Sequence, residues 1–306
     1  MHVCGLLGWW VSAEKSPKPS SDFCVIGVRL SLNHSLSGGA TISVTTDRLA
    51  KLDAILADIL VKQRLGCGEA ASLTGQLGFA LCACFGRVGR AKIRPFIRRS
   101  YEALMDMNVQ LQAALIWWRS FLREYKPKSV PTSLKHIDVV ISYSDGEGAN
   151  AGVGVAVWAP KINGPPLAAF TNVPNGIRAL WRRRAGRTEE YRDIFLVETI
   201  GPLLLLETFP KVMKNSLWIH FIDNEGGQHA LVKGSSSIEA GDEIIGMTWS
   251  RIQKLGLWLY ADRVDSGANP TDGLSRGRMQ GPWKQVYKAT LPKELIKLAE
   301  ASEPYQ

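Results

Sequence analysis

The sequence predicts an α/β (α+β) protein, in which a helical module is followed by a mixed five-stranded sheet flanked by helices. Between residues 45 and 124, apolar residues recur at spacings of three and four, as on one face of an amphipathic helix. Two prolines within residues 126–131 then predict a linker. Beyond the linker, short apolar runs alternate with segments of helical period, which is the pattern of a sheet covered by helices.

The helical module is expected to contain three helices. The first begins near Thr45, has Asp47 in its first turn, where a negative charge suits the helix dipole, and ends before Gly66. The second is expected from Glu69 to about Phe85. The third presents one apolar face, made of Leu104, Met107, Leu111, Leu115, Trp118 and Leu122.

After the linker we expect two hairpin-linked strands and a third strand, followed by helix, strand, helix and strand. The strands are expected at residues 137–144, 151–158, 166–172, 216–222 and 257–260. The helices are expected at about 189–208 and 239–254, with a short helix near the C-terminus. Another short apolar strand is expected before the helical module, at residues 23–28.

Composition indicates a folded protein with a polyanionic partner. The chain has 306 residues, 45% of them hydrophobic, which is enough for two cores, and its net charge is +9. Basic residues cluster at 87–99 and at 178–187, with no acidic residue in either segment. Such clusters favour nucleic acid first and a membrane surface second, and the alternative is that the charge serves solubility alone. The second cluster is interpreted either as a loop that grips a substrate or as a solvated surface segment.

Three features bear on the cellular compartment. No run of about 18 apolar residues occurs, so no membrane span is expected. The first residues lack a basic region followed by a long apolar stretch, so no signal peptide is predicted. The five cysteines have no zinc-site spacing and are interpreted as small, reduced core residues. We therefore expect an intracellular protein in a reducing compartment, either the cytoplasm or the nucleus.

Four acidic residues occupy positions where a site can form. Asp145 ends one apolar strand, Glu198 lies in an otherwise apolar helix, Asp223 follows another strand, and Asp272 begins a short helix. Taken singly, each aspartate is most simply a turn residue, and Glu198 could pair with an arginine of the second basic cluster. Taken together, the four carboxylates predict a site for two Mg²⁺ ions about 4 Å apart, which clamp the attacking and leaving oxygens of a phosphodiester.

These motifs resemble the RNase H family of retroelement reverse transcriptases. The stretches YSDG, Glu198, FIDN and ANPTDGLSR match the acidic signatures of the family in order, at residues 143–146, 198, 221–224 and 268–276. The amino-acid sequences of these motifs are most similar to those of DIRS-like retroelements. The resemblance implies an RNase H-like fold and hydrolysis of the RNA strand of an RNA–DNA hybrid. It also implies that Mg²⁺, or Mn²⁺, is held by Asp145, Glu198, Asp223 and Asp272.

The first half of the chain resembles other parts of the same polymerases. Residues 7–15 look like the segment after the polymerase catalytic strand, with Lys15 near the triphosphate, and residues 23–30 are similar to the primer-grip hairpin. The implied domains are a palm remnant at 1–43, a helical thumb and connection at 44–128, an RNase H-like domain at 129–285 and a C-terminal tail at 286–306. The residues implied to contact nucleic acid are Arg87, Arg90, Lys92, Arg94, Arg98, Arg99, Gly146, Asn224 and Asn269.

The sequence also departs from the family pattern. The paired aspartates of the polymerase do not occur, so we expect no DNA synthesis from this chain alone and a missing polymerase domain as its partner. No histidine stands shortly before Asp272, and Gly201-Pro202 predicts a kink in the helix of Glu198. His220 is expected to be a packed edge residue, whereas His229 could approach a leaving group. The alternatives are a non-catalytic nucleic-acid-binding remnant and an RNase H-fold nuclease that acts on DNA.

Overall fold

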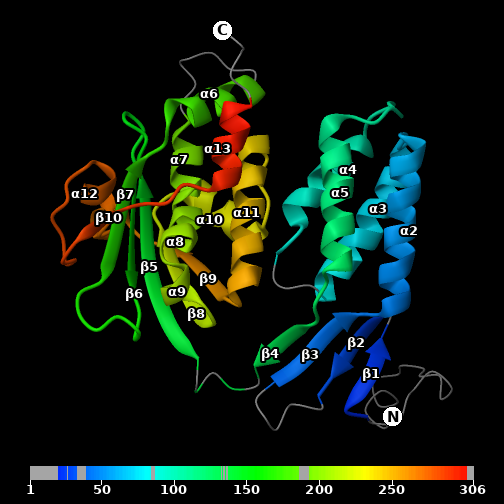
Figure 1. The fold of residues 1–306 in the computed structure, drawn as a ribbon, viewed down its shortest axis with the longest axis horizontal. Helices are drawn as coiled ribbons and strands as arrows, with labels where there is room; N and C mark the ends of the chain where they lie inside the picture. Colours follow the sequence, from blue (N-terminus) through cyan, green and yellow to red (C-terminus); the bar gives the residue numbers. More distant parts are fainter. Residues whose placement is uncertain are drawn as a thin grey trace, which may run out of the picture.

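The computed structural model describes residues 20–25, 27–32, 39–83, 87–131, 133, 135, 137–185 and 193–301. They form two bodies side by side: a large mixed sheet with its helices, and a helical module that stands on a small sheet (Figure 1). Lys15 lies outside the described residues. Among the helices in the described ranges, none is long and apolar enough to cross a membrane.

The small sheet joins the chain segments before and after the helical module. Its antiparallel strands lie in the order β1 (Asp22–Val25), β2 (Val28–Ser31), β3 (Gly39–Val44) and β4 (Lys128–Pro131). The run expected as one strand at 23–28 is instead a hairpin that turns at Gly27, where φ is +80°. The expected linker is wrong in part, because residues 128–131 pair with β3 at an edge of the sheet, where proline is tolerated.

The helices of the module are α2 (Thr46–Lys62), α3 (Cys67–Ala80), α4 (Arg90–Arg99) and α5 (Val109–Arg123), and they share one core. α2 ends at Gln63, which has a left-handed φ of 52°, and Gly66 instead precedes the first residue of α3. α5 begins after Asn108, whose side chain accepts a hydrogen bond from Leu111 N at 2.8 Å. Leu104 therefore lies outside the helix that was expected to include it.

Two expectations for this half of the chain are wrong. α4 is not anticipated, because basic residues and Pro95 separate its buried apolar residues and obscure their helical period. The cysteines that the structure describes in a free state, Cys24, Cys67 and Cys82, are exposed rather than buried in a core.

The large sheet has the strand order β10-β7-β6-β5-β8-β9. Five of these strands lie close to the expected positions: β5 (Asp138–Gly146), β6 (Gly152–Trp158), β7 (Leu167–Asn172), β8 (Ser216–Ile222) and β9 (Trp258–Arg263). β5, β6 and β7 are antiparallel neighbours, whereas β8 runs parallel to β5 and β9 runs parallel to β8. Three antiparallel strands continued by two parallel strands, with helices packed on the sheet, make the fold RNase H-like.

The expected count of five strands and the expected C-terminal tail are both wrong. β10 (Val286–Lys288) pairs parallel with β7 and adds a sixth strand. After it, α13 (Lys293–Glu300) packs against α6 (Asn175–Arg184), with Leu295 fully buried. Residues 286–300 therefore belong to the large-sheet body. A strand of three residues is too short to show a period in the sequence, and only its pairing with β7 reveals it.

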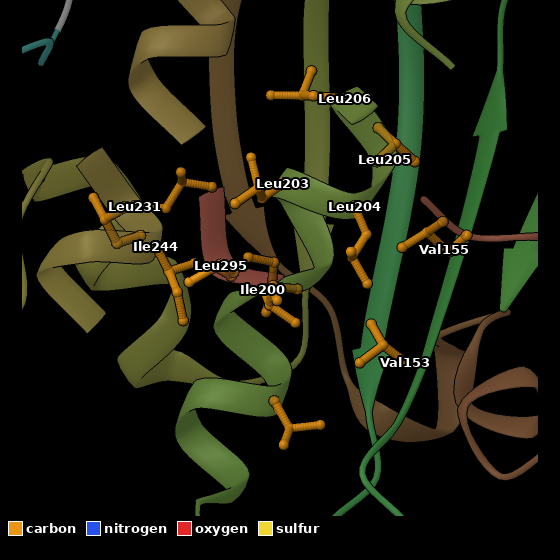
Figure 2. Packing of buried hydrophobic residues seen from close by; sticks show 14 of the residues in the cluster. Val153, Val155, Ile200, Leu203, Leu204, Leu205, Leu206, Leu231, Ile244 and Leu295 are labelled. Carbon is orange, nitrogen blue, oxygen red and sulfur yellow. The ribbon is translucent and has the colours of Figure 1, made fainter. Parts of the chain in front are cut away.

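The two faces of the large sheet are covered differently (Figure 1). The main helical layer contains α7 (Ile194–Thr199), α8 (Gly201–Thr208), α9 (Pro210–Met213), α10 (Glu225–Lys233) and α11 (Glu239–Leu255), whereas α12 (Asp272–Ser275) lies on the other face. Figure 2 shows Leu204 of α8 close to Val153 and Val155 of β6. Because side chains alternate along a strand, Gly152 and Gly154 face α12 instead.

The helix expected at 189–208 is described from residue 193 onwards, and it is divided. α7 ends at Thr199 and α8 begins at Gly201, with Pro202 in its first turn. Proline lacks the N–H group that would reach the carbonyl of Glu198. The helix is therefore interrupted next to Glu198, at the place where Gly201-Pro202 predicts it.

Candidate active site

Asp145 lies at the end of β5, inside the large sheet, and is 5% exposed. Its Oδ2 atom accepts a hydrogen bond from Ser275 Oγ of α12. Burial raises the pKa of Asp145 to about 6, the hydrogen bond from Ser275 opposes the rise, and the negative charges of Asp223 and Asp272 add to it. Asp145 is therefore a buried acid whose protonation depends on other acids nearby.

Glu198 reaches the same end of the sheet from α7. A Cβ atom at Gly146 would lie 2.8 Å from Glu198 Cα and N, so only a glycine lets α7 approach β5 this closely. Burial raises the pKa of Glu198 to about 8, the charges of Asp223 and Asp145 add to the rise, and a hydrogen bond with Asn224 opposes it. The buried Oε2 atom of Glu198 has no hydrogen-bond partner among the residues that the structure describes.

Among the residues that the structure describes, Arg178 and Arg182 pair with Asp193 and not with Glu198, which was the alternative for the second basic cluster. Arg178 Nε and Nη2 donate to the two carboxylate oxygens of Asp193 at 2.8 and 3.0 Å. Arg182 lies 3.5 Å from the same carboxylate, and Arg184 forms a separate ion pair. These arginines belong to α6, so this part of the basic segment is neither a gripping loop nor free surface charge.

Asp223 directly follows β8. This strand runs parallel to β5 with Ile222 opposite Ser144, so the register brings Asp223 and Asp145 to the same end of the sheet. Ser266 Oγ donates to Asp223 Oδ2 at 3.1 Å, whereas within the described part of the chain the buried Asp223 Oδ1 has no hydrogen-bond partner. Asp223 thus has one oxygen held by the protein and one with no partner.

Asp272 is the first residue of α12. Arg276 Nη2 donates to Asp272 Oδ1 at 2.8 Å, and Arg278 Nη2 lies 3.7 Å from Oδ2. The carboxylate is therefore held in ion pairs on the face of the sheet opposite α7. Its negative charge nevertheless contributes to the raised pKa of Asp145.

The four acids influence one another but do not enclose a common point. Within the described ranges, no three His, Cys, Asp or Glu side chains are arranged to hold a metal ion. Asp145 is turned toward α12, whereas Glu198 approaches from α7. Glu198 Oε2 and Asp223 Oδ1, which have no hydrogen-bond partner among the described residues, are nevertheless hard carboxyl oxygens of the kind that Mg²⁺ prefers. The donor set therefore fits Mg²⁺ chemically, and side-chain rotation is needed to close it.

Basic residues of α4 that were expected to grip nucleic acid face the large-sheet body. Arg94 Nε lies 3.6 Å from Asp242 Oδ2 and Arg98 Nη1 lies 3.9 Å from Glu239 Oε2, both on α11. Lys92 is half-buried. Burial raises the pKa of Asp242 to about 6, while a backbone hydrogen bond and the charges of Arg94, Arg98 and Lys92 oppose the rise. These residues join the helical module to the large sheet.

The remaining arginines of this cluster also have partners within the chain. Arg87 Nε donates to the carbonyl of Val232 at 3.2 Å, and Arg90 Nη1 donates to the carbonyl of Lys233 at 3.4 Å. Arg99 is 1% exposed and donates to the carbonyl of residue 106 at 2.9 Å. The expectation that Arg99 contacts a duplex is therefore wrong, because the side chain is buried within the helical module.

The two asparagines expected to contact nucleic acid hold turns beside the acids. Asn224 caps α10, and its Oδ1 accepts a hydrogen bond from Gly227 N at 2.7 Å. Asn269 is buried, donates from Nδ2 to the carbonyl of Ser144 at 3.1 Å, and accepts a hydrogen bond from Thr271. Each asparagine thus fixes the backbone next to a candidate ligand.

His220 is packed, as expected, but it lies inside the sheet rather than at an edge. It is on β8, between β5 and β9, and its ring nitrogens lie 2.8 and 3.1 Å from the hydroxyls of Ser142 and Ser144. Burial lowers its pKa to about 3, so the ring is neutral. His229 lies on α10 and lines a surface depression with Lys233.

Sequence reasoning missed two contacts that shape the site. The hydroxyl of Ser275 holds Asp145, and the only signal is that Ser275 stands three residues after Asp272, on the same side of a helical turn. Asp193 pairs with Arg178 across fifteen residues, a separation that carries no local signal.

Comparisons with known proteins show a distant likeness. No family model matches and no curated protein matches. Two solved structures of the foamy viral protease-reverse transcriptase in complex with double-stranded DNA are similar. One has a TM-score of 0.32 and 12% identity over 85% of this chain and 41% of its own. The other has a TM-score of 0.29 and 14% identity over 81% and 46%.

This chain therefore spans less than half the length of either reverse transcriptase structure. The likeness does not extend to the DIRS group. We take the RNase H-like fold from the strand order and strand directions.

Proposed function

We propose that this chain is an RNase H-type nuclease that cuts the RNA strand of an RNA–DNA hybrid, as the C-terminal part of a DIRS-like reverse transcriptase. One observation supports the proposal most. Asp145, Glu198 and Asp223 lie at the same end of two parallel central strands, where burial, with the added effect of their mutual repulsion, raises the pKa of both Asp145 and Glu198. A cluster of buried acidic groups with raised pKa values is typical of a site built for cations or for acid–base chemistry.

In this proposal the four acids hold Mg²⁺ or Mn²⁺, which would activate a water molecule and stabilise the leaving oxygen of a phosphodiester. Asp145 supplies Oδ1, because its Oδ2 is held by Ser275. Glu198 and Asp223 supply the two oxygens that have no hydrogen-bond partner. Asp272 takes part only after it leaves the ion pair with Arg276, so this residue has the largest rearrangement to make.

The hybrid would be held through its backbone and its 2′-hydroxyl groups rather than through its bases. Four arginines around α4 are occupied within the chain, which leaves fewer of the expected contacts for phosphate. Arg276 and Arg278 lie next to Asp272, and both side chains are more than half exposed. These two cations are the better candidates for contacts with phosphate near the reacting bond.

The alternative is a nucleic-acid-binding protein without catalytic activity. Two observations favour it: the acids do not enclose a metal-sized point among the described residues, and the helix is broken next to Glu198. An RNase H-fold nuclease that acts on DNA is a further alternative.

The decisive experiment incubates the purified chain with an RNA–DNA hybrid labelled on each strand, in Mg²⁺ and separately in Mn²⁺. Asp223→Asn removes one charge from the site. Asp58→Asn is the matched control, because Asp58 is exposed on α2 and pairs only with Lys62 among the contacts of the described residues.

Three outcomes separate the alternatives. Cutting of the RNA strand by wild type and Asp58→Asn, but not by Asp223→Asn, supports the nuclease. Salt-sensitive binding without cutting in either metal refutes it and supports the binding protein. Cutting confined to the DNA strand, or to duplex DNA, supports the DNA nuclease.

A further inference from the structure

The hydroxyl of Ser275 lies between two of the candidate metal ligands. Its Oγ donates to Asp145 Oδ2 and lies 2.9 Å from the carbonyl oxygen of Asp272. Both Ser275 and Asp145 are buried, at 1% and 5% exposure. The contact therefore lies out of reach of bulk water, where a hydrogen bond to a carboxylate is strong and directional.

The backbone around Ser275 is placed by two glycines of β6. Gly154 pairs directly with Asp145 across the β5–β6 ladder. A Cβ atom at Gly154 would lie 2.8 Å from Ser275 N, and a Cβ atom at Gly152 would lie 2.0 Å from Ser275 O. Any larger residue at either position would push α12 off the sheet. The two glycines therefore allow Ser275 to reach Asp145.

The rest of the surroundings show why the orientation of Asp145 needs control. Glu198 touches Gly146 from the α7 side of the sheet, whereas Ser275 and Asp272 lie on the α12 side. Asp145 lies between Glu198 on one side and Ser275 and Asp272 on the other, and its carboxylate can rotate toward either side. Holding one of its oxygens on the α12 side leaves the other for the side of Glu198 and Asp223.

We propose that Ser275 is a positioning residue, which fixes Asp145 Oδ2 and thereby presents Asp145 Oδ1 as the metal-binding oxygen. This inference rests on the proposed nuclease function. Ser275 itself touches neither the metal nor the substrate. Residues that orient metal ligands typically contribute ten- to a hundredfold to metal affinity, and we expect an effect of this size.

The test measures Mg²⁺ binding to the full chain by isothermal titration calorimetry, and hybrid cleavage as a function of Mg²⁺ concentration. Ser275→Ala removes the hydroxyl, and Ser275→Cys replaces it with a weaker donor of similar size. Ser216→Ala is the matched control, since Ser216 is equally buried and donates to the carbonyl of Met213 at 2.5 Å, within the segment that leads into β8.

We expect Ser275→Ala to bind Mg²⁺ ten- to a hundredfold more weakly than wild type, with Ser275→Cys between them and Ser216→Ala unchanged. Saturating Mg²⁺ should restore most of the cleavage rate of Ser275→Ala. A purely structural role would lower the melting temperatures of both alanine variants and leave their Mg²⁺ affinity alone.

Two results overturn the inference, and they are distinguishable. If wild type and Ser275→Ala both bind Mg²⁺ and cut the hybrid, and do so at the same Mg²⁺ concentrations, Ser275 does not position Asp145. If wild type neither binds Mg²⁺ nor cuts, the proposed nuclease function fails, and the role of Ser275 fails with it. Should Ser275→Ala not fold, the affinity of Ser275→Cys decides in the same way.

Discussion

Replacing Arg178 by methionine should destabilise the large-sheet body and weaken the support of the helix that carries Glu198. The guanidinium of Arg178 forms two hydrogen bonds with Asp193, at 2.8 and 3.0 Å. The two side chains are only 15% and 3% exposed. The carbonyl of Asp193 in turn accepts hydrogen bonds from Leu196 N and Val197 N, in the first turn of α7. The substitution would leave a buried carboxylate whose remaining cation, Arg182, lies 3.5 Å away.

The expected cost follows from this geometry. Removing one partner of a buried ion pair typically costs about 3–5 kcal/mol. Arg182 remains 3.5 Å from Asp193, which places the expected loss near the lower end, at about 3 kcal/mol. For a protein of this size, such a loss lowers the melting temperature by roughly 6–12 °C.

The assay is urea unfolding followed by circular dichroism at pH 7, with melting curves alongside. Lys211→Met is the matched control, because it removes one exposed positive charge from α9. The double variant Arg178→Met/Asp193→Asn should recover part of the loss, since no charge is then left buried without its main partner.

The pH dependence provides a further check. Burial opposes ionisation of Asp193, but the hydrogen bonds and charge of Arg178 outweigh it and hold the pKa of Asp193 below its ordinary value. The pair therefore stabilises the fold above about pH 4, where the unfolded carboxyl is ionised, and the contribution disappears as pH falls through the lower folded pKa. A loss under about 0.5 kcal/mol at pH 7, the range of an ordinary surface substitution, would refute the reasoning.

Three other predictions concern the site and its surroundings. The pKa of Glu198 is raised from an ordinary value of 4.5 to about 8, so metal-free wild type should lose stability as pH rises from about 4.5 to about 8. Glu198→Gln should remove this loss in EDTA-treated protein, and equal slopes for the two proteins would contradict the raised pKa. The pKa of His220 is lowered to about 3 in the folded protein, so the unfolded chain takes up the proton first as pH falls. His220 should therefore cost about 1.4 kcal/mol per pH unit between about pH 6 and pH 3, and acid titration of His220→Gln should lack this contribution. Gly146→Ala should cost about 1–3 kcal/mol in urea unfolding, because its Cβ would meet the backbone of Glu198, whereas Gly267→Ala, with nothing within 4 Å, should be neutral.

Much of the fold can be predicted from local patterns. The strands at 138–146, 152–158, 167–172 and 216–222 lie within two residues of their expected positions, because each is an apolar run bounded by turn residues. The interruption next to Glu198 can also be predicted, since it depends only on the missing N–H group of Pro202. α4 escapes prediction because basic residues and a proline interrupt its apolar period, and β10 escapes prediction because it has only three residues.

The candidate site is predicted in part. Placing Asp145 and Asp223 at the ends of two strands is enough to expect them together, once those strands are parallel neighbours. The contacts that each acid makes cannot be predicted from the sequence. The hydrogen bond from Ser275, the ion pair that holds Asp272 and the partnerless oxygen of Glu198 all depend on contacts across the sheet.

By itself, the sequence determined most strands of the large sheet and the positions of the four acids along the chain, because strand and helix periods and turn residues act over a few positions. Only the tertiary structure decided which groups the charged side chains contact. The arginines from 87 to 99 looked like a surface for nucleic acid, yet several of them contact α10 and α11. The sequence around a charged residue does not reveal its ion-pair or hydrogen-bond partner. That partner depends on how segments more than a hundred residues apart pack together.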